Sequence, residues 1–139
     1  MKHFVIIALI FFFISCKHAN NKDQTIELAE KIFVVNTVDN QKKLQEYLQY
    51  HKKVWPQVEE GFKKAGYKSI ALYHFKDLIV MRITFPKNAD LNKMGVTAEA
   101  FNPRCAEWNR IMNAYQKGVN GTSQEQTWVE AVPFYKFSN

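Results

Sequence analysis

The sequence crowds a histidine, two tyrosines and a tryptophan into the stretch Tyr47-Leu-Gln-Tyr-His51-Lys-Lys-Val-Trp55-Pro56. Residues four apart share one face of an α-helix, so Tyr47 and His51 are predicted to point the same way. Pro56 lacks a backbone N–H and disfavours helix in the residue before it, so the helix is expected to break at Val54-Trp55. A phenol beside an imidazole can place and transfer a proton near neutral pH. The stretch therefore predicts a helix break and a candidate acid–base pair.

The residues around this stretch predict one strand before it and a second helix after it. Residues 31–37 are rich in β-branched and aromatic side chains, which is typical of a strand. Asp39 is expected to cap the helix that leads to His51. The second helical piece starts at Pro56 and is expected to stop at Gly66.

The second half of the domain predicts three more strands and a helix. Residues 69–75 and 78–85 flank a short Lys76-Asp77 turn and indicate an antiparallel hairpin. Residues 94–103 are expected to be irregular, and residues 104–117 show helical spacing. The last strand is expected over residues 127–137.

The predicted order is strand, helix, strand, strand, helix, strand. This βαββαβ pattern indicates the α+β class and a ferredoxin-like sandwich. Helices on one face of a four-stranded sheet leave its other face without a partner, and we expect a homodimer formed through that face.

The N-terminus has the anatomy of a secretory signal peptide over residues 1–15. A positively charged start precedes an apolar run that is too short to cross a bilayer, and the small residue Ser15 ends it. Phe13-Ile-Ser-Cys16 resembles the box of bacterial lipoproteins, with Phe13 where leucine is usual. A lipidated Cys16 would anchor an exported protein to a membrane, facing the periplasm or the cell surface. The alternative is ordinary secretion with a chance cysteine.

Residues 16–30 are polar and predict a tether, and residues 31–139 suit one compact domain. Cys105 is the only cysteine left besides Cys16, and its apolar surroundings favour a packed thiol. The chain carries a net charge of +6, but its lysines are scattered and its arginines few. Because an exported protein rarely meets nucleic acid, this charge does not indicate a nucleic-acid partner.

Several motifs together resemble the L-rhamnose mutarotase family over residues 31–137. They are Tyr47-x-x-x-His51-x-x-x-Trp55-Pro56, the Gly66 break, Ala71-x-Tyr73, Cys105-x-x-Trp108 and the closing Phe134-Tyr135. The resemblance implies a dimeric α/β barrel of ferredoxin-like protomers. It also implies an aldose 1-epimerase that interconverts the anomers of a 6-deoxy-hexose such as L-rhamnose, with no cofactor and no metal.

The resemblance assigns roles to some residues, and at other positions this chain differs from the family pattern. The family's proton-donating histidine falls on His51, and its sugar-contacting tyrosine on the same helix falls on Tyr47. A second family tyrosine is replaced by Ile70, and a Trp-Trp pair by Trp108-Asn109. The family usually has an acidic residue after Trp-Pro, and this chain has Gln57 there.

Mutarotation needs one group that both gives and takes a proton, and a histidine does so near neutral pH. We expect His51 to act as acid and then base, with Tyr47 positioning a sugar hydroxyl. Trp108 would offer the sugar a flat apolar surface, Asn109 would bond a hydroxyl, and Ile70 would line the cleft.

Each of these residues also has a structural interpretation. His51 could be an exposed residue that interacts with the helix dipole, and Tyr47 and Trp108 could be core residues. His74 shares a strand face with Ile70 and could reach the rim of the cleft, or it could simply face solvent. His51 and His74 have no third ligand at a suitable spacing, so no metal site is predicted.

Two other functions fit the same sequence. One is a sugar-binding lipoprotein that has lost turnover, which the Ile70 and Asn109 replacements would explain. The other is a different dimeric ferredoxin-like enzyme, such as a small monooxygenase.

Overall fold

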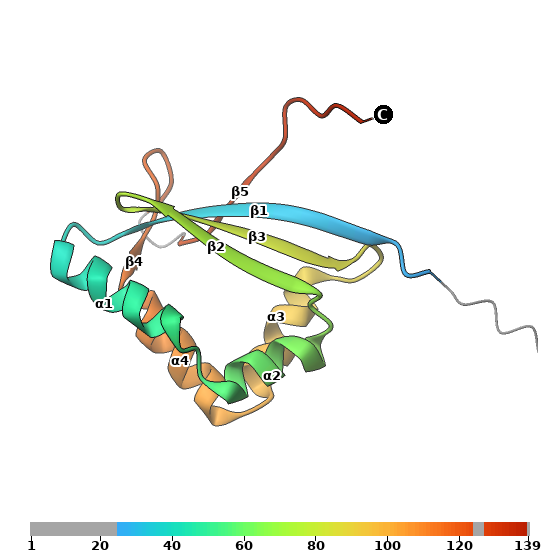
Figure 1. The fold of residues 1–139 in the computed structure, drawn as a ribbon, viewed down its shortest axis with the longest axis horizontal. Helices are drawn as coiled ribbons and strands as arrows, with labels where there is room; N and C mark the ends of the chain where they lie inside the picture. Colours follow the sequence, from blue (N-terminus) through green and yellow to red (C-terminus); the bar gives the residue numbers. More distant parts are fainter. Residues whose placement is uncertain (1–24, 124–126, 139) are drawn as a thin grey trace, which may run out of the picture.

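The computed structural model describes residues 25–123 and 127–138 and confirms an α+β fold of the ferredoxin-like type (Figure 1). The strands are β1 (Leu28–Thr37), β2 (Ser69–Phe75), β3 (Leu78–Pro86), β4 (Gln116–Lys117) and β5 (Val129–Ala131). The helices are α1 (Gln41–Lys52), α2 (Pro56–Ala65), α3 (Leu91–Ala100) and α4 (Pro103–Asn113). The sheet has the order β2-β3-β1-β4, and β5 also pairs with β1. All four helices lie on one face of this sheet (Figure 1).

The predicted helix break is confirmed. The first helix ends at Lys52, and α2 begins at Pro56, where the missing N–H costs nothing because that position has no partner inside the helix. Gly66 ends α2 with a φ of 95°, a left-handed conformation that glycine adopts freely. The expected cap at Asp39 was wrong by one residue, because the Asn40 side chain accepts from the backbone N–H of Lys43 (3.1 Å).

The predicted hairpin is also confirmed, and its turn at Lys76-Asp77 has Lys76 at a φ of 54°. The first strand begins at Leu28, before the expected start at Lys31, because it pairs with β3 as far as Pro86. This long strand therefore sets the register of β3, β4 and β5, and β3 sets that of β2.

The expectation of an irregular segment over residues 94–103 was wrong. The segment is mostly helical, because α3 runs to Ala100 after Asp90 caps it by accepting from the N–H of Asn92 (2.9 Å). Met94 and Ala98 are four residues apart and both buried. Gly95 lies between them and weakens the helix signal in the sequence.

Two boundaries at the C-terminal end were also wrong. The last helix stops at Asn113 instead of Lys117, because Gln116 and Lys117 pair with β1 as β4. The last strand covers only Val129–Ala131, where it pairs with Val34 and its neighbours. Pairing with β1 overrides the local helical preference of Gln116 and Lys117, whereas the last strand stops at Ala131 because its pairing with β1 ends there.

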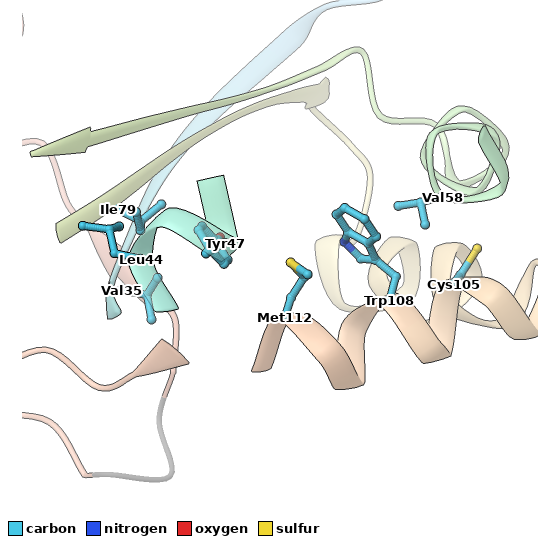
Figure 2. Close-up of a cluster of buried hydrophobic side chains, with 8 residues drawn as sticks. All are labelled: Val35, Leu44, Tyr47, Val58, Ile79, Cys105, Trp108 and Met112. Atoms are coloured by element: carbon cyan, nitrogen blue, oxygen red, sulfur yellow. The ribbon is translucent and has the colours of Figure 1, made fainter. Parts of the chain in front are cut away.

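The helix-covered side of the sheet holds two clusters of buried side chains. The first joins α1, α2 and α4 to the strands (Figure 2) and contains Val35, Leu44, Tyr47, Val58, Ile79, Cys105, Trp108 and Met112. The second is built around Ile83, Phe85 and Met94. In Figure 2, Trp108 and Met112 point from α4 toward the sheet. Cys105 is buried, as predicted for a packed thiol.

The other side of the sheet has no helix over it (Figure 1). It carries the ion pair of Arg82 with Glu30 as well as apolar residues. Strand register places Tyr73, Val80, Val34 and Val129 side by side in one row across β2, β3, β1 and β5. Neighbouring Phe75 is 71% exposed, which is unusual for so large an apolar side chain. We call this side the open face.

The predicted signal peptide, Cys16 and the tether as far as residue 24 lie outside the described residues. Among residues 25–123 and 127–138, no helix combines the length and the apolar character needed to cross a membrane.

Candidate functional site

A cavity of about 510 Å³ lies between the two buried clusters, under the helix-covered face of the sheet. All five residues predicted to contact a sugar line it. They are Tyr47 and His51 from α1, Ile70 from β2, and Trp108 and Asn109 from α4. These residues are far apart in the sequence, and the fold brings them together around one cavity.

The ring of His51 is fixed by a hydrogen bond within its own helix. Its Nδ1 lies 2.9 Å from the backbone carbonyl oxygen of Tyr47. A carbonyl oxygen can only accept, so Nδ1 carries the hydrogen, and the neutral ring has its lone pair on Nε2. The ring also packs against Tyr47, with centroids 4.4 Å apart, and against Trp108, with centroids 5.4 Å apart. This arrangement presents one defined nitrogen for proton transfer.

Burial changes the acid–base properties of both groups. It lowers the pKa of His51 from the ordinary 6.5, and the hydrogen bond that the ring donates to the Tyr47 carbonyl oxygen opposes this effect only in part. Burial also raises the pKa of the Tyr47 phenol, against a smaller effect of a hydrogen bond from Gln116. Near neutral pH the pair is therefore a neutral imidazole base beside a protonated phenol donor.

The interpretation of Tyr47 and Trp108 as core residues is confirmed, because both side chains are buried in the first cluster. Tyr47 is 2% exposed and Trp108 5%, yet both also line the cavity. Trp55 instead packs edge-on against Trp108 with centroids 5.3 Å apart, and the Arg104 guanidinium lies 3.7 Å above its ring centroid. Trp55 does not line the cavity and packs against Trp108 at the helix break, so its role is structural.

Two altered family positions supply different surfaces. Ile70 makes one wall apolar together with Leu72 and Met81. Asn109 donates from Nδ2 to the Glu99 carboxylate (2.9 Å), which leaves its amide oxygen for a ligand hydroxyl.

Sequence reasoning missed several polar and aromatic lining residues: Tyr67, Asn113, Gln116 and Trp128. Gln116 is the most informative, because its Nε2 donates to the Tyr47 hydroxyl oxygen (3.4 Å). Sequence reasoning missed Gln116 because it placed residues 104–117 in one helix, whereas Gln116 lies on β4. As a helical residue, Gln116 would not have paired with β1.

His74 does not reach this cavity. It is exposed and lines a separate hollow of about 600 Å³ at the end of the sheet, with Lys76 and Asp77. That hollow is lined by Leu44 of the first buried cluster but by none of the five residues predicted to contact a sugar. Gln57 contributes its backbone carbonyl to the Cys105 thiol (3.3 Å). The described residues contain no group of three or more histidine, cysteine, aspartate or glutamate side chains that could hold a metal ion.

Comparison with known proteins points to one family. The family model for L-rhamnose mutarotase matches residues 16–137. An L-fucose mutarotase from Xanthomonas campestris pv. campestris is 25% identical over 108 residues, which cover 76% of this chain and 86% of that protein. A UPF0734 protein from Dictyostelium discoideum is 24% identical over 96 residues, covering 66% of this chain and 74% of that protein.

One solved structure supports the fold. A dimeric ferredoxin-like protein from an uncultured marine organism superposes with a TM-score of 0.52 at 12% identity. The match covers 81% of this chain and 94% of that one.

The geometry predicts how His51 titrates. Because burial lowers its pKa below 6.5, the folded protein binds fewer protons than the unfolded chain as the pH falls past that value. The stability contributed by neutral His51 is complete above about pH 6.5 and is lost as the pH falls through the lowered pKa. Imidazole ¹H–¹⁵N spectra should show a pKa below 6.5 and a hydrogen on Nδ1. A pKa above 6.5, or a hydrogen on Nε2 in the neutral form, would contradict this geometry.

Proposed function

Because this chain belongs to the L-rhamnose mutarotase family, whose model matches residues 16–137, we propose that it interconverts the α and β anomers of a 6-deoxy-hexose. The observation that carries the proposal is the pair of partly buried His51 and buried Tyr47 at the wall of the 510 Å³ cavity. The neutral imidazole has a lone pair on Nε2, and the phenol beside it keeps its proton. Such a pair can run proton transfer in both directions near neutral pH.

In the proposed reaction His51 moves one proton between two sugar oxygens. Nε2 takes the proton of the C1 hydroxyl while the bond from C1 to the ring oxygen breaks, which gives the open-chain aldehyde. The imidazolium then returns that proton to the former ring oxygen. After rotation about the C1–C2 bond, the same transfers in reverse close the ring on the other face of C1. Tyr47 donates a hydrogen bond to the oxygen on which negative charge develops, and this lowers the barrier.

The cavity walls favour a sugar with an apolar end. Trp108 offers a flat ring to a C–H face, and Ile70 with Leu72 offers an apolar surface to a methyl group. L-rhamnose and L-fucose, the sugars named for the family and for one relative, both carry that methyl group. The Asn109 amide oxygen adds one acceptor for a hydroxyl. These features support a deoxy-hexose as the substrate class.

Saturation-transfer NMR between the anomeric protons of L-rhamnose and of L-fucose tests the proposal. We expect the native protein to accelerate exchange of at least one of these sugars. His51→Ala should lower the rate by about 10²–10⁴-fold, the usual contribution of a general acid–base group. The activity should decline as the pH falls through the lowered pKa of His51, because protonated His51 cannot accept the C1 proton.

His74→Ala is the matched control, since that histidine lines the separate hollow, and it should leave exchange unchanged. Binding of both anomers without acceleration would instead support a sugar-binding lipoprotein. Binding of an aromatic or quinone-like ligand with indifference to sugars would support a different ferredoxin-like enzyme.

The protein is further proposed to be a homodimer joined through the open face. The row of Tyr73, Val80, Val34 and Val129 is apolar across the sheet. Beyond β5 the chain exposes more large apolar side chains, among them Phe134, Tyr135 and Phe137. A second copy related by a two-fold axis would cover both sets at once, because the same surface then meets itself.

Light scattering after size-exclusion chromatography tests the dimer. We expect a mass of twice that of the chain, and Tyr73→Lys should shift it toward the monomer, because a charge on the row would be buried without a partner. Val96→Lys changes an exposed apolar residue on α3, away from the open face, and should keep the dimer. A native monomer, or dissociation by both variants alike, would contradict the proposed interface.

Export and lipidation at Cys16 are also proposed, from the apolar run that precedes Ser15-Cys16. In bacteria fed an alkyne-labelled fatty acid, the native chain should take up the label and enter the detergent phase. Cys16→Ser should remain in the aqueous phase, whereas Cys105→Ser should keep the label because Cys105 is buried in the fold. Absence of label on the native chain would contradict the proposed lipid anchor, and it would not bear on the proposed mutarotase function.

A further inference from the structure

Gln116 occupies an unusual position for a polar side chain. It lies on β4, where it pairs with Thr37 of β1, and it lines the cavity beside Tyr47. Its Nε2 donates to the Tyr47 hydroxyl oxygen at 3.4 Å. Its other amide atom, Oε1, is buried and has no hydrogen-bond partner among the described residues.

This arrangement is poor for stability. A buried carbonyl oxygen without a donor carries a desolvation penalty that an apolar side chain of the same shape avoids. The single bond that Gln116 makes is long, so it returns little of that cost. A residue kept only for packing at this place would be apolar, like Met81 or Met112, which line the same cavity.

The bond to Tyr47 has a directional consequence. When Gln116 donates to the Tyr47 oxygen, the phenol hydrogen cannot point at Gln116 and must point elsewhere. The Tyr47 ring lines the cavity, and its proton is held because burial raises the pKa of the phenol. The phenol hydrogen is therefore free to bond an oxygen that enters the cavity.

We propose that Gln116 is a positioning residue that makes Tyr47 a hydrogen-bond donor toward the bound sugar. The inference rests on the proposed mutarotase function and deepens it, because it assigns the residue that orients the donor beside the His51 base. Gln116 acts through Tyr47 and needs no contact with the sugar itself.

The opposite orientation of the amide group makes a different prediction. If Oε1 faced Tyr47, the phenol would donate to Gln116 and would offer the sugar only lone pairs. In that case Gln116→Glu would preserve the arrangement, since a carboxylate is an even better acceptor. In the proposed orientation the same change draws the phenol hydrogen away from the sugar.

The experiment compares Gln116→Met and Gln116→Glu with the native protein by anomeric exchange NMR and by chemical unfolding. Gln116→Met should lower kcat about tenfold, the effect of a lost hydrogen-bond donor, and change KM little. Its unfolding midpoint should equal or exceed that of the native protein, because a buried unpaired oxygen has gone. Gln116→Glu should lose at least as much kcat although the side chain keeps its size.

Gln49→Met is the matched control, since this glutamine is exposed on α1 away from the cavity, and it should change neither rate nor stability. A native rate in Gln116→Glu would overturn the proposed orientation. A lower unfolding midpoint in Gln116→Met with an unchanged kcat would show that Gln116 is only structural. If the native protein accelerates no sugar, the proposed function fails first, whereas a fast native protein with a fast Gln116→Met variant overturns this inference alone.

Discussion

The site depends on one backbone constraint, the end of α1 that Pro56 enforces. Proline cannot donate a hydrogen bond within a helix, so α1 closes at Lys52 and α2 starts afresh at Pro56. His51 therefore stands in the last turn of α1, where its ring bonds the Tyr47 carbonyl and packs against Tyr47 and Trp108. A helix that continued through residue 56 would carry the chain past the cavity and leave no second helix to close it.

The same constraint explains the chemistry available at the site. The ring of His51 is partly buried among aromatic side chains, which favours its neutral form, and its own helix fixes which nitrogen holds the hydrogen. Tyr47 is buried deeper and stays protonated. An acid and a base with opposite proton preferences thus lie side by side, with ring centroids 4.4 Å apart. The arrangement carries a desolvation penalty at Gln116, whose buried Oε1 has no hydrogen-bond partner among the described residues.

Local sequence signals predicted the parts of the structure that local rules decide. The proline break, the Gly66 end and the hairpin turn follow from backbone chemistry, and the helical spacing of Tyr47 and His51 follows from periodicity. The resemblance to the family brought Ile70, Trp108 and Asn109 to the same site, which spacing alone could not do. Local sequence patterns failed where pairing with β1 determines the secondary structure. Gln116 and Lys117 continue a helical pattern in the sequence but pair with β1 as β4. The weak pattern around Gly95 likewise hid α3.

A crystal structure of the protein with a slowly converted deoxy-hexose would test the central claim most directly. The account predicts a sugar in the cavity between the two buried clusters, with its C1 hydroxyl within hydrogen-bond distance of His51 Nε2 and its methyl group against Ile70 and Trp108. A sugar bound in the hollow beside His74, or one whose C1 faces away from His51, would contradict it.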